Sequence, residues 1–255
     1  MMKIFSGGDD MLMYIATALI FNFFSFVMVR IYQAGRFTYN HSKYPAFNGR
    51  VFLVAGMMAQ PEKTYARIEM PYSVRVNLNY SLLGYNPKNA GKQLEEMALS
   101  EDYLIGLGTG CKAIIYSHRD DVKRILINPA THSIAFKAEY QMWLRYAPIL
   151  VGLSCILGWI SAIPIIPTKS GNFYSLALLS DQLYWSYYGD PRFNDLGKVD
   201  KTGLIVSEYD KYVVNYISES IYQGAKVKEI KTEHGKTVKE HSKYDAAIKQ
   251  LLAKD

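Results

Sequence analysis

Cysteine and histidine are scarce in this chain of 255 residues. The two cysteines, Cys111 and Cys155, have neither the spacing of metal ligands nor that of a disulfide framework. The five histidines form no H-x-x-x-H or H-E-x-x-H pair. We therefore expect no metal site and no cofactor, and the low cysteine content favours a reducing compartment.

A clustered basic stripe is also missing, although the net charge is +6. Lysine is densest from Lys226 to Lys254, where aspartate and glutamate are interleaved with it. Nucleic-acid binding domains concentrate their basic residues on one face, so we expect no nucleic-acid partner. A hydrophobic content of 49% with 20% charged residues is typical of a globular domain rather than a disordered chain.

Charge is absent from residues 11–29, a run of 19 residues that matches the thickness of a bilayer core. A signal peptide would begin with basic residues, whereas Asp9 and Asp10 precede this run. Arg30 and Arg36 follow it, and cytoplasmic flanks carry an excess of such residues. The pattern predicts a single N-terminal anchor, with the main domain on the cytoplasmic or a matrix-equivalent side.

Strand and helix patterns alternate after this anchor. Apolar or alternating runs predict strands at 50–56, 74–80, 102–107, 122–128, 203–210 and 225–231. Helices are predicted at 90–100, directly after residue 110, at 212–222 and at 243–252. This alternation is typical of a mostly parallel sheet with helices on both faces.

Three glycines follow the third of these strands. Gly106, Gly108 and Gly110 have the G-x-S-x-G spacing of a nucleophile elbow, with glycine at the position of the serine. A dinucleotide-binding loop spaces its glycines G-x-G-x-x-G and needs an acidic residue about 20 positions further on, whereas Asp120 comes too early. The pattern therefore favours an elbow that has lost its reactive atom.

The order of motifs around this elbow resembles the α/β-hydrolase family over residues 50–252. The matching segments are Ala55-Gly56 at the oxyanion loop, Gly106–Gly110, Ile127-Asn-Pro129, Ser207–Asp210 at the acid and Thr232–Gly235 at the histidine. Ala55 stands where the family has histidine, and Gly108 where it has serine. The glycine at the elbow is also similar to the N-myc downstream-regulated branch, whose members are regarded as non-catalytic.

The resemblance implies a role for each matching residue. Asp210 and His234 would be the remaining members of a catalytic triad, and His241 would replace His234 if the loop alignment slips. The backbone of Thr109 and Met57 would line the oxyanion hole or pocket. The side chains of Thr109 and Cys111 are expected to point away from that pocket, into the turn or the following helix.

A second uncharged run, residues 147–167, has 21 residues and invites two interpretations. If the strands on either side of it share one sheet, it is a lid that dips into the membrane interface or packs on the anchor. If it spans, the chain is a two-span membrane protein. We favour the lid, and expect an anchor at 1–36, hydrolase-like parts at 37–130 and 203–255, and a lid insertion at 131–202.

Without a nucleophile, the sequence favours a membrane-anchored pseudoenzyme that acts by binding. Its partners would be membrane lipid, other proteins of a membrane complex, and an acyl or lipid ligand in the pocket. The alternative from another class is a lipid- or ester-directed hydrolase in which His234, held by Asp210, activates water.

Overall fold

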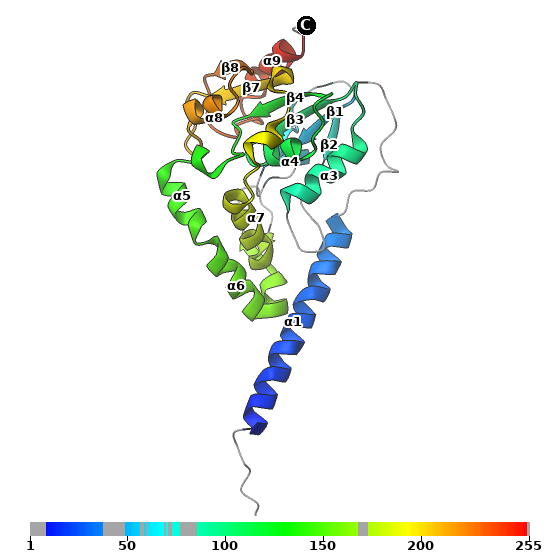
Figure 1. The fold of residues 1–255 in the computed structure, drawn as a ribbon, viewed down its shortest axis with the longest axis vertical. Coiled ribbons are helices and arrows are strands. Elements are labelled where there is room, and N and C mark those ends of the chain that lie inside the picture. The colour runs from blue at the N-terminus through cyan, green and yellow to red at the C-terminus, as the bar shows by residue number, and fades with distance from the viewer. Residues whose placement is uncertain are drawn as a thin grey trace, which may run out of the picture.

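The structure is a computed structural model, and it describes residues 9–37, 49–56, 59, 61–68, 70, 73–76, 86–167 and 173–253. A parallel sheet with helices on both sides forms one end of the molecule (Figure 1). A helical arm and the long helix α1 (Asp9–Phe37) extend from it. Of the predicted site residues, Met57 lies outside the described residues.

The main sheet has six strands in the order β2-β1-β3-β4-β7-β8. These are β1 (Val51–Val54), β2 (Ser73–Val76), β3 (Tyr103–Leu107), β4 (Lys123–Ile127), β7 (Thr202–Ser207) and β8 (Lys226–Ile230). Every neighbouring pair in this sheet is parallel. The predicted parallel α/β sheet is confirmed, although residues 77–80 of the predicted second strand lie outside the described residues.

Helices cover both faces because the strands alternate apolar side chains between them. Phe52 and Val54 of β1 belong to the core under α3 (Pro87–Met97), α4 (Gly110–Tyr116) and α8 (Asn215–Ile221). Val51 and Leu53 belong to the core under α9 (His241–Leu252). A short helix, α2 (Pro61–Thr64), precedes the buried Tyr65 on this second side.

A cap is inserted between β4 and β7. It contains η2 (Ser133–Ala135), α5 (Ala138–Arg145), α6 (Ala147–Leu157), η3 (Gly158–Ala162), α7 (Leu176–Tyr188), η4 (Phe193–Leu196) and η5 (Val199–Lys201), with an antiparallel pair formed by β5 (Pro164–Pro167) and β6 (Phe173–Ser175). Because β4 and β7 pair in parallel from Arg124 and Thr202, the insertion leaves and rejoins one sheet.

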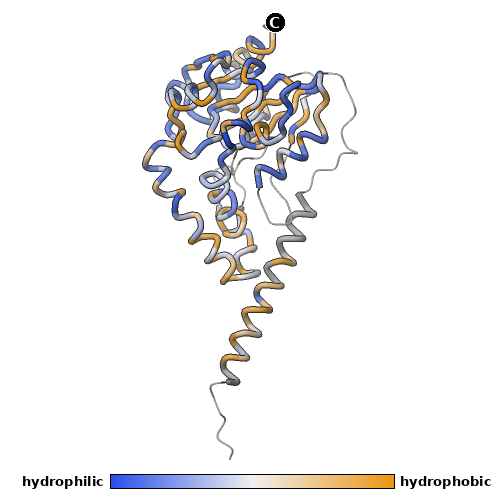
Figure 2. Tube along the Cα trace, viewed as in Figure 1, coloured by the Kyte–Doolittle hydropathy of each residue, from blue (hydrophilic) through white to orange (hydrophobic). Residues whose placement is uncertain are grey.

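The arm formed by α5, α6, η3 and α7 reaches down to the middle of α1 (Figure 1). Helix α1 contacts η3 and α6. At this contact Gly158 lies so close to Asn22 that a Cβ on the glycine would be 2.9 Å from the carbonyl oxygen and from the Oδ1 of the asparagine. Both elements are strongly apolar in this region (Figure 2). Glycine at position 158 permits this close approach, and its φ of 55° ends α6 within the uncharged run of residues 147–167.

Within the part of the chain that the structure describes, one helical stretch is long and apolar enough to cross a membrane, Ala138–Ala162, and 28% of its apolar window is buried. A shorter apolar stretch of α1 covers Leu12–Phe24. A helix is thus observed over the predicted anchor, and a membrane around it stays a proposal.

Two neighbouring strands of the sheet are joined at their starts by a buried ion pair. Arg50 precedes β1 and Asp102 precedes β3, with Nη2 of the arginine 2.8 Å from Oδ2 of the aspartate. The carboxylate also accepts hydrogen bonds from the backbone N–H groups of Arg50, at 3.0 Å, and Leu99, at 2.8 Å. The Asp102 side chain is fully buried, so these contacts replace all of its hydration.

We expect Asp102→Ala to lower the free energy of unfolding by about 3–5 kcal/mol, because it leaves the Arg50 guanidinium buried without its counter-charge. The matched control is Asp121→Ala, which removes an equally short ion pair with Arg119 but from a side chain that is 50% exposed. That change should cost about 1 kcal/mol or less. Urea unfolding of both variants measures the difference, and equal losses would contradict the assignment.

Candidate functional site

The elbow predicted from the three glycines is present between β3 and α4. Gly108 has a φ of +57°, the left-handed conformation that a sharp strand-to-helix turn requires. Its N–H donates to the carbonyl oxygen of Ile127 at 2.8 Å, and its own carbonyl accepts from Ala130 at 3.2 Å and from Cys111 at 3.3 Å. These bonds fix the turn against the end of β4.

The small residues beside the apex are required by close packing. A Cβ on Gly110 would lie 2.4 Å from the carbonyl oxygen of Ala55, and a Cβ on Gly106 would lie 2.7 Å from Cδ1 of Ile114. A Cβ on Gly56 would lie 2.7 Å from the carbonyl oxygen of Leu107. At Gly108 itself a Cβ would meet the ring of His234, with Nε2 at 3.3 Å, which is a tight contact but one with the end of a side chain rather than with backbone.

Asp210 and His234 form a hydrogen-bonded pair opposite the elbow. Asp210 follows β7 and His234 follows β8, and Oδ2 of the acid lies 2.6 Å from Nδ1 of the imidazole. The other carboxylate oxygen accepts from the backbone N–H groups of Tyr212 and Val213, at 2.8 and 2.9 Å. With Nδ1 engaged by the acid, Nε2 faces the position where a serine hydroxyl would stand.

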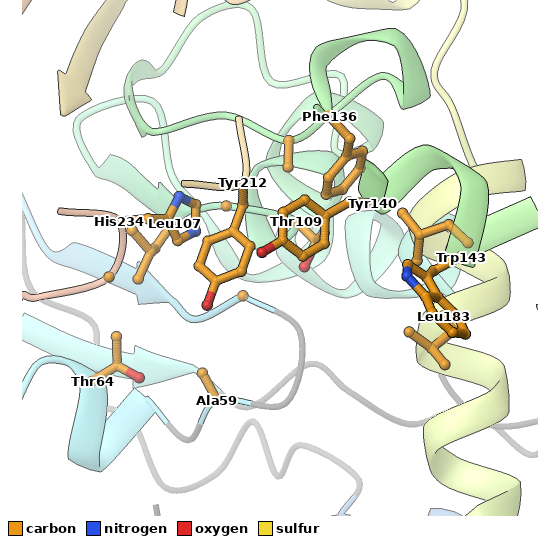
Figure 3. Close-up of a pocket in the computed structure, with 15 residues that line it drawn as sticks. Ala59, Thr64, Leu107, Thr109, Phe136, Tyr140, Trp143, Leu183, Tyr212 and His234 are labelled. Carbon is orange, nitrogen blue, oxygen red and sulfur yellow. The ribbon is translucent and has the colours of Figure 1, made fainter. Parts of the chain in front are cut away.

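A cavity of about 530 Å³ opens between the elbow and the cap (Figure 3). Its lining is mostly apolar and aromatic: Gly56, Ala59, Thr64, Leu107, Gly108, Thr109, Ala130, Phe136, Tyr140, Trp143, Leu144, Leu183, Tyr212, His234 and Gly235. The polar groups are few and include the hydroxyls of Tyr140, Tyr212 and Thr109. A cavity of this size and polarity is typical of a small-ligand site.

The structure also places the other three candidate residues, Thr109, Cys111 and His241. Thr109 lines the cavity, where the resemblance placed it. Cys111 is fully buried, its Sγ contacts the carbonyl oxygen of Ile127 at 3.9 Å, and burial raises the pKa of its thiol. His241 is the first residue of α9, and the imidazole beside Asp210 is that of His234.

The aromatic residues around the cavity are the part of the site that the sequence did not reveal. Tyr212 packs edge-to-face on His234 with ring centroids 5.3 Å apart, and Tyr140 of α5 packs on Tyr212 at 4.9 Å. Trp143 of α5 also lines the cavity, yet it is 71% exposed. No spacing rule links these positions to the elbow, since α5 is brought over it by the tertiary fold.

A buried lysine connects the elbow helix to the cap. Lys112 of α4 donates from Nζ to the carbonyl oxygens of Trp185 and Ser186 at 3.1 and 2.8 Å, and to Oδ1 of Asp190 at 2.9 Å. Oδ2 of Asp190 accepts from the backbone N–H and the hydroxyl of Ser133, both at 2.7 Å. The cation thus holds the C-terminal end of α7 against α4, where a positive charge is favourable.

No protein-family model and no curated protein matches this sequence. Among solved structures, the chain is similar to a hydrolase from Oleispira antarctica, with a TM-score of 0.61 and 10% identity over 83% of this chain and 93% of that one. A hydrolase from Pseudomonas aeruginosa gives a TM-score of 0.54 at 10% identity, covering 83% and 92% of the two chains.

BpoC from Mycobacterium tuberculosis, assigned as a non-heme bromoperoxidase, gives a TM-score of 0.56 at 10% identity, covering 82% of this chain and 93% of that one. Identities this low establish a shared architecture and leave the activity open. The chain therefore has an α/β-hydrolase-like fold, a parallel sheet flanked by helices.

The buried position of Lys112 generates a pH prediction. Desolvation lowers the pKa of its ammonium group to about 8, against the pull of Asp190. An unfolded lysine keeps its proton up to about pH 10.4, so between these values the unfolded chain binds more protons and stability rises with pH. The free energy of unfolding of wild type, relative to that of Lys112→Met, should therefore increase from pH 8 to pH 10. The increase is at most about 1.4 kcal/mol per pH unit.

Urea unfolding at pH 8, 9 and 10 tests this expectation. Lys249→Met is the control, because that side chain is 57% exposed and pairs only at the surface with Asp245. A flat difference for Lys112→Met would show that the ammonium is hydrated in solution.

Proposed function

We propose that this protein is a membrane-anchored, non-catalytic relative of the α/β hydrolases that works by binding an acyl or lipid ligand in the old active-site pocket. The single observation that carries this proposal is Gly108, an elbow apex with the geometry of a nucleophile position and no side chain. Covalent catalysis of the serine-hydrolase type needs an attacking oxygen at that position.

Neighbouring side chains are poor substitutes for the missing serine. Cys111 is buried and its raised pKa keeps the thiol protonated, whereas the thiolate is the nucleophile. Thr109 lines the cavity, but it is only 4% exposed. The apolar lining from Leu144, Leu183 and Phe136 instead suits the binding of hydrocarbon.

Exposed apolar side chains support the membrane part of the proposal. On α1 they include Leu12, Ile15, Leu19, Ile20, Phe21, Phe23 and Phe24, and on the arm Met142, Trp143, Ile149, Leu153, Ile156, Trp159 and Ile160. The core helix of a water-soluble protein buries such residues, and contiguous exposed patches of this kind mark interaction surfaces. Because β4 and β7 pair in one sheet, the arm is better placed as a lid that dips into the bilayer than as a single crossing.

A second candidate function is the hydrolysis of an ester by activated water. The observation that favours it is the short Asp210–His234 bond, with Nε2 directed at the space above Gly108. A water molecule in that space would lie within reach of a general base. This candidate requires turnover that is lost in His234→Ala.

We expect wild-type protein to resist labelling by a fluorophosphonate probe, and Gly108→Ser to become labelled, because the new hydroxyl would face Nε2 of His234. The double variant Gly108→Ser/His234→Ala should lose about 10²- to 10⁴-fold in labelling rate with the base removed. Gly108→Ala is the steric control and should stay unlabelled. Probe labelling of wild type that disappears in Thr109→Val would assign a threonine nucleophile and sink the non-catalytic proposal.

Turnover of short and long acyl esters by wild type and His234→Ala separates the two candidate functions. Absence of ester turnover in both wild type and His234→Ala agrees with a binding protein. Turnover that only wild type shows would replace it with the water mechanism.

Cys155 provides a native reporter for the membrane proposal, because it is exposed on α6 while Cys111 is buried and unreactive. Bimane attached to Cys155 in phosphatidylcholine vesicles should be quenched by lipids with a doxyl group on the acyl chain and shielded from iodide. The control places the probe at exposed Ser220 on α8, as Ser220→Cys in a Cys155→Ser background. That site should show the reverse pattern, and iodide quenching at both sites would place the arm in water.

A further inference from the structure

We propose that the cavity is filled sideways from the lipid bilayer, past Trp143, by an amphiphile with one hydrocarbon chain and a carbonyl-bearing head. This inference rests on the proposed function, and it adds the class of ligand and its route. It is argued from the depth of the arm, from the position of Trp143 and from the distribution of polar groups in the cavity.

The contact between α1 and the arm sets the depth of the arm. Arg30, the first charged residue after the uncharged run of α1, lies eight positions beyond Asn22. At 1.5 Å per residue, Asn22 is about 12 Å along the helix from that charge. Gly158 at the tip of the arm packs on Asn22, so an α1 that spans the bilayer carries the tip nearly to the middle of a core about 30 Å thick.

Polarity along the arm agrees with this depth. Arg145 closes α5, and residues 146–167 after it carry no charge. The arm therefore meets water above Arg145 and hydrocarbon below it, since an arginine at a helix end lies at the interface. Asn22 packs against the backbone at Gly158 within this uncharged region.

Trp143 stands where the cavity and this interface coincide. It lies two positions before Arg145, lines the cavity and is nevertheless 71% exposed. An amphipathic aromatic ring at headgroup level is typical of membrane interfaces. The ring is thus both a wall of the cavity and part of the outer surface of the arm, which makes it the rim of an opening toward lipid.

Polar and apolar groups are separated within the cavity. Trp143 and Leu183 lie at one end, His234 lies at the other, and the hydroxyls of Tyr140 and Tyr212 lie between them (Figure 3). A bilayer amphiphile keeps its head outward and its chain inward. Such a molecule enters the cavity with its head group first, so that the head group lies toward His234. Its chain stays directed toward the bilayer, and the molecule does not have to reverse its orientation.

The ligand chemistry follows from these groups. The tyrosine hydroxyls can donate hydrogen bonds to the carbonyl or carboxylate of a head group. Nε2 of His234, with Nδ1 donating to Asp210, can accept one from the hydroxyl of a carboxylic acid or of a monoester. Leu144, Leu183 and Phe136 offer hydrocarbon contact for the chain. A volume of about 530 Å³ matches a single-chain fatty acid or its monoester better than a two-chain phospholipid.

The test measures uptake of cis-parinaric acid, a fluorescent fatty acid, by full-length protein in phosphatidylcholine vesicles. Ile156→Glu places a charge on the arm at a residue that is 66% exposed and does not line the cavity. It should slow uptake from vesicles at least roughly tenfold, because a carboxylate is expensive within the bilayer. Its binding constant in detergent, where no bilayer is crossed, should be unchanged.

Two controls make the outcome specific. Tyr216→Glu adds the same charge at a residue that is 73% exposed on α8, away from the arm, and should leave the uptake rate unchanged. Leu183→Arg obstructs the apolar end of the cavity and should abolish binding both from vesicles and in detergent.

The outcomes distinguish failure of the proposed route from failure of the proposed ligand-binding function. Equal uptake rates for wild type, Ile156→Glu and Tyr216→Glu, with binding intact, would overturn the lateral route and leave a ligand-binding protein. Absence of binding by wild type in both settings would overturn the proposed ligand and the route together. Binding that Leu183→Arg retains would place the probe outside the cavity and would also overturn the proposal.

Discussion

The sharp turn at Gly108 is the constraint on which the rest of the site depends. Its backbone groups bond to the end of β4, and its neighbours Gly106 and Gly110 press against Ile114 and Ala55 with no space for a methyl group. Strands β1, β3 and β4 are therefore locked together around the turn. At position 108 a Cβ would meet the ring of His234 rather than backbone, and the left-handed backbone there is the conformation that glycine adopts most readily.

Beside this turn Asp210 and His234 have the arrangement of the acid and base of a catalytic triad. The Asp210 carboxylate is oriented by two backbone N–H groups and in turn holds His234, as in a triad. In a binding protein the same arrangement serves as a preorganised hydrogen-bonding end of an apolar cavity. The pair is thus compatible with the proposed binding role, because orienting a ligand uses the same directed groups as orienting a hydroxyl.

Sequence patterns predicted the sheet and the polar pair because these depend on local signals. The strands are short apolar or alternating runs, and parallel strands bring Asp210 and His234 to one edge of the sheet. The cap could not be predicted in the same way. Lys112 looks like a surface lysine in sequence, and its burial arises from carbonyls of α7 more than 70 positions away.

The side chains over the elbow illustrate the same limit. Thr109 lines the cavity as the family order predicted, but the aromatic side chains that close the cavity over it were not predicted. Tyr140 and Trp143 lie on a helix whose position depends on the whole insertion and on its contact with α1. Periodicity identifies which residues are apolar, but not which face of an inserted helix will cover a site.

The insertion between β4 and β7 also has a consequence for the order in which the molecule folds. Arg124 and Thr202 are paired neighbours although 78 positions separate them, and contacts of such high sequence separation form slowly. Helices α1, α5 and α6 are local structures that form without them. A chain emerging from the ribosome would therefore expose its apolar helices before the last two strands complete the sheet. During that interval a nearby bilayer would cover the surface that is most prone to aggregation.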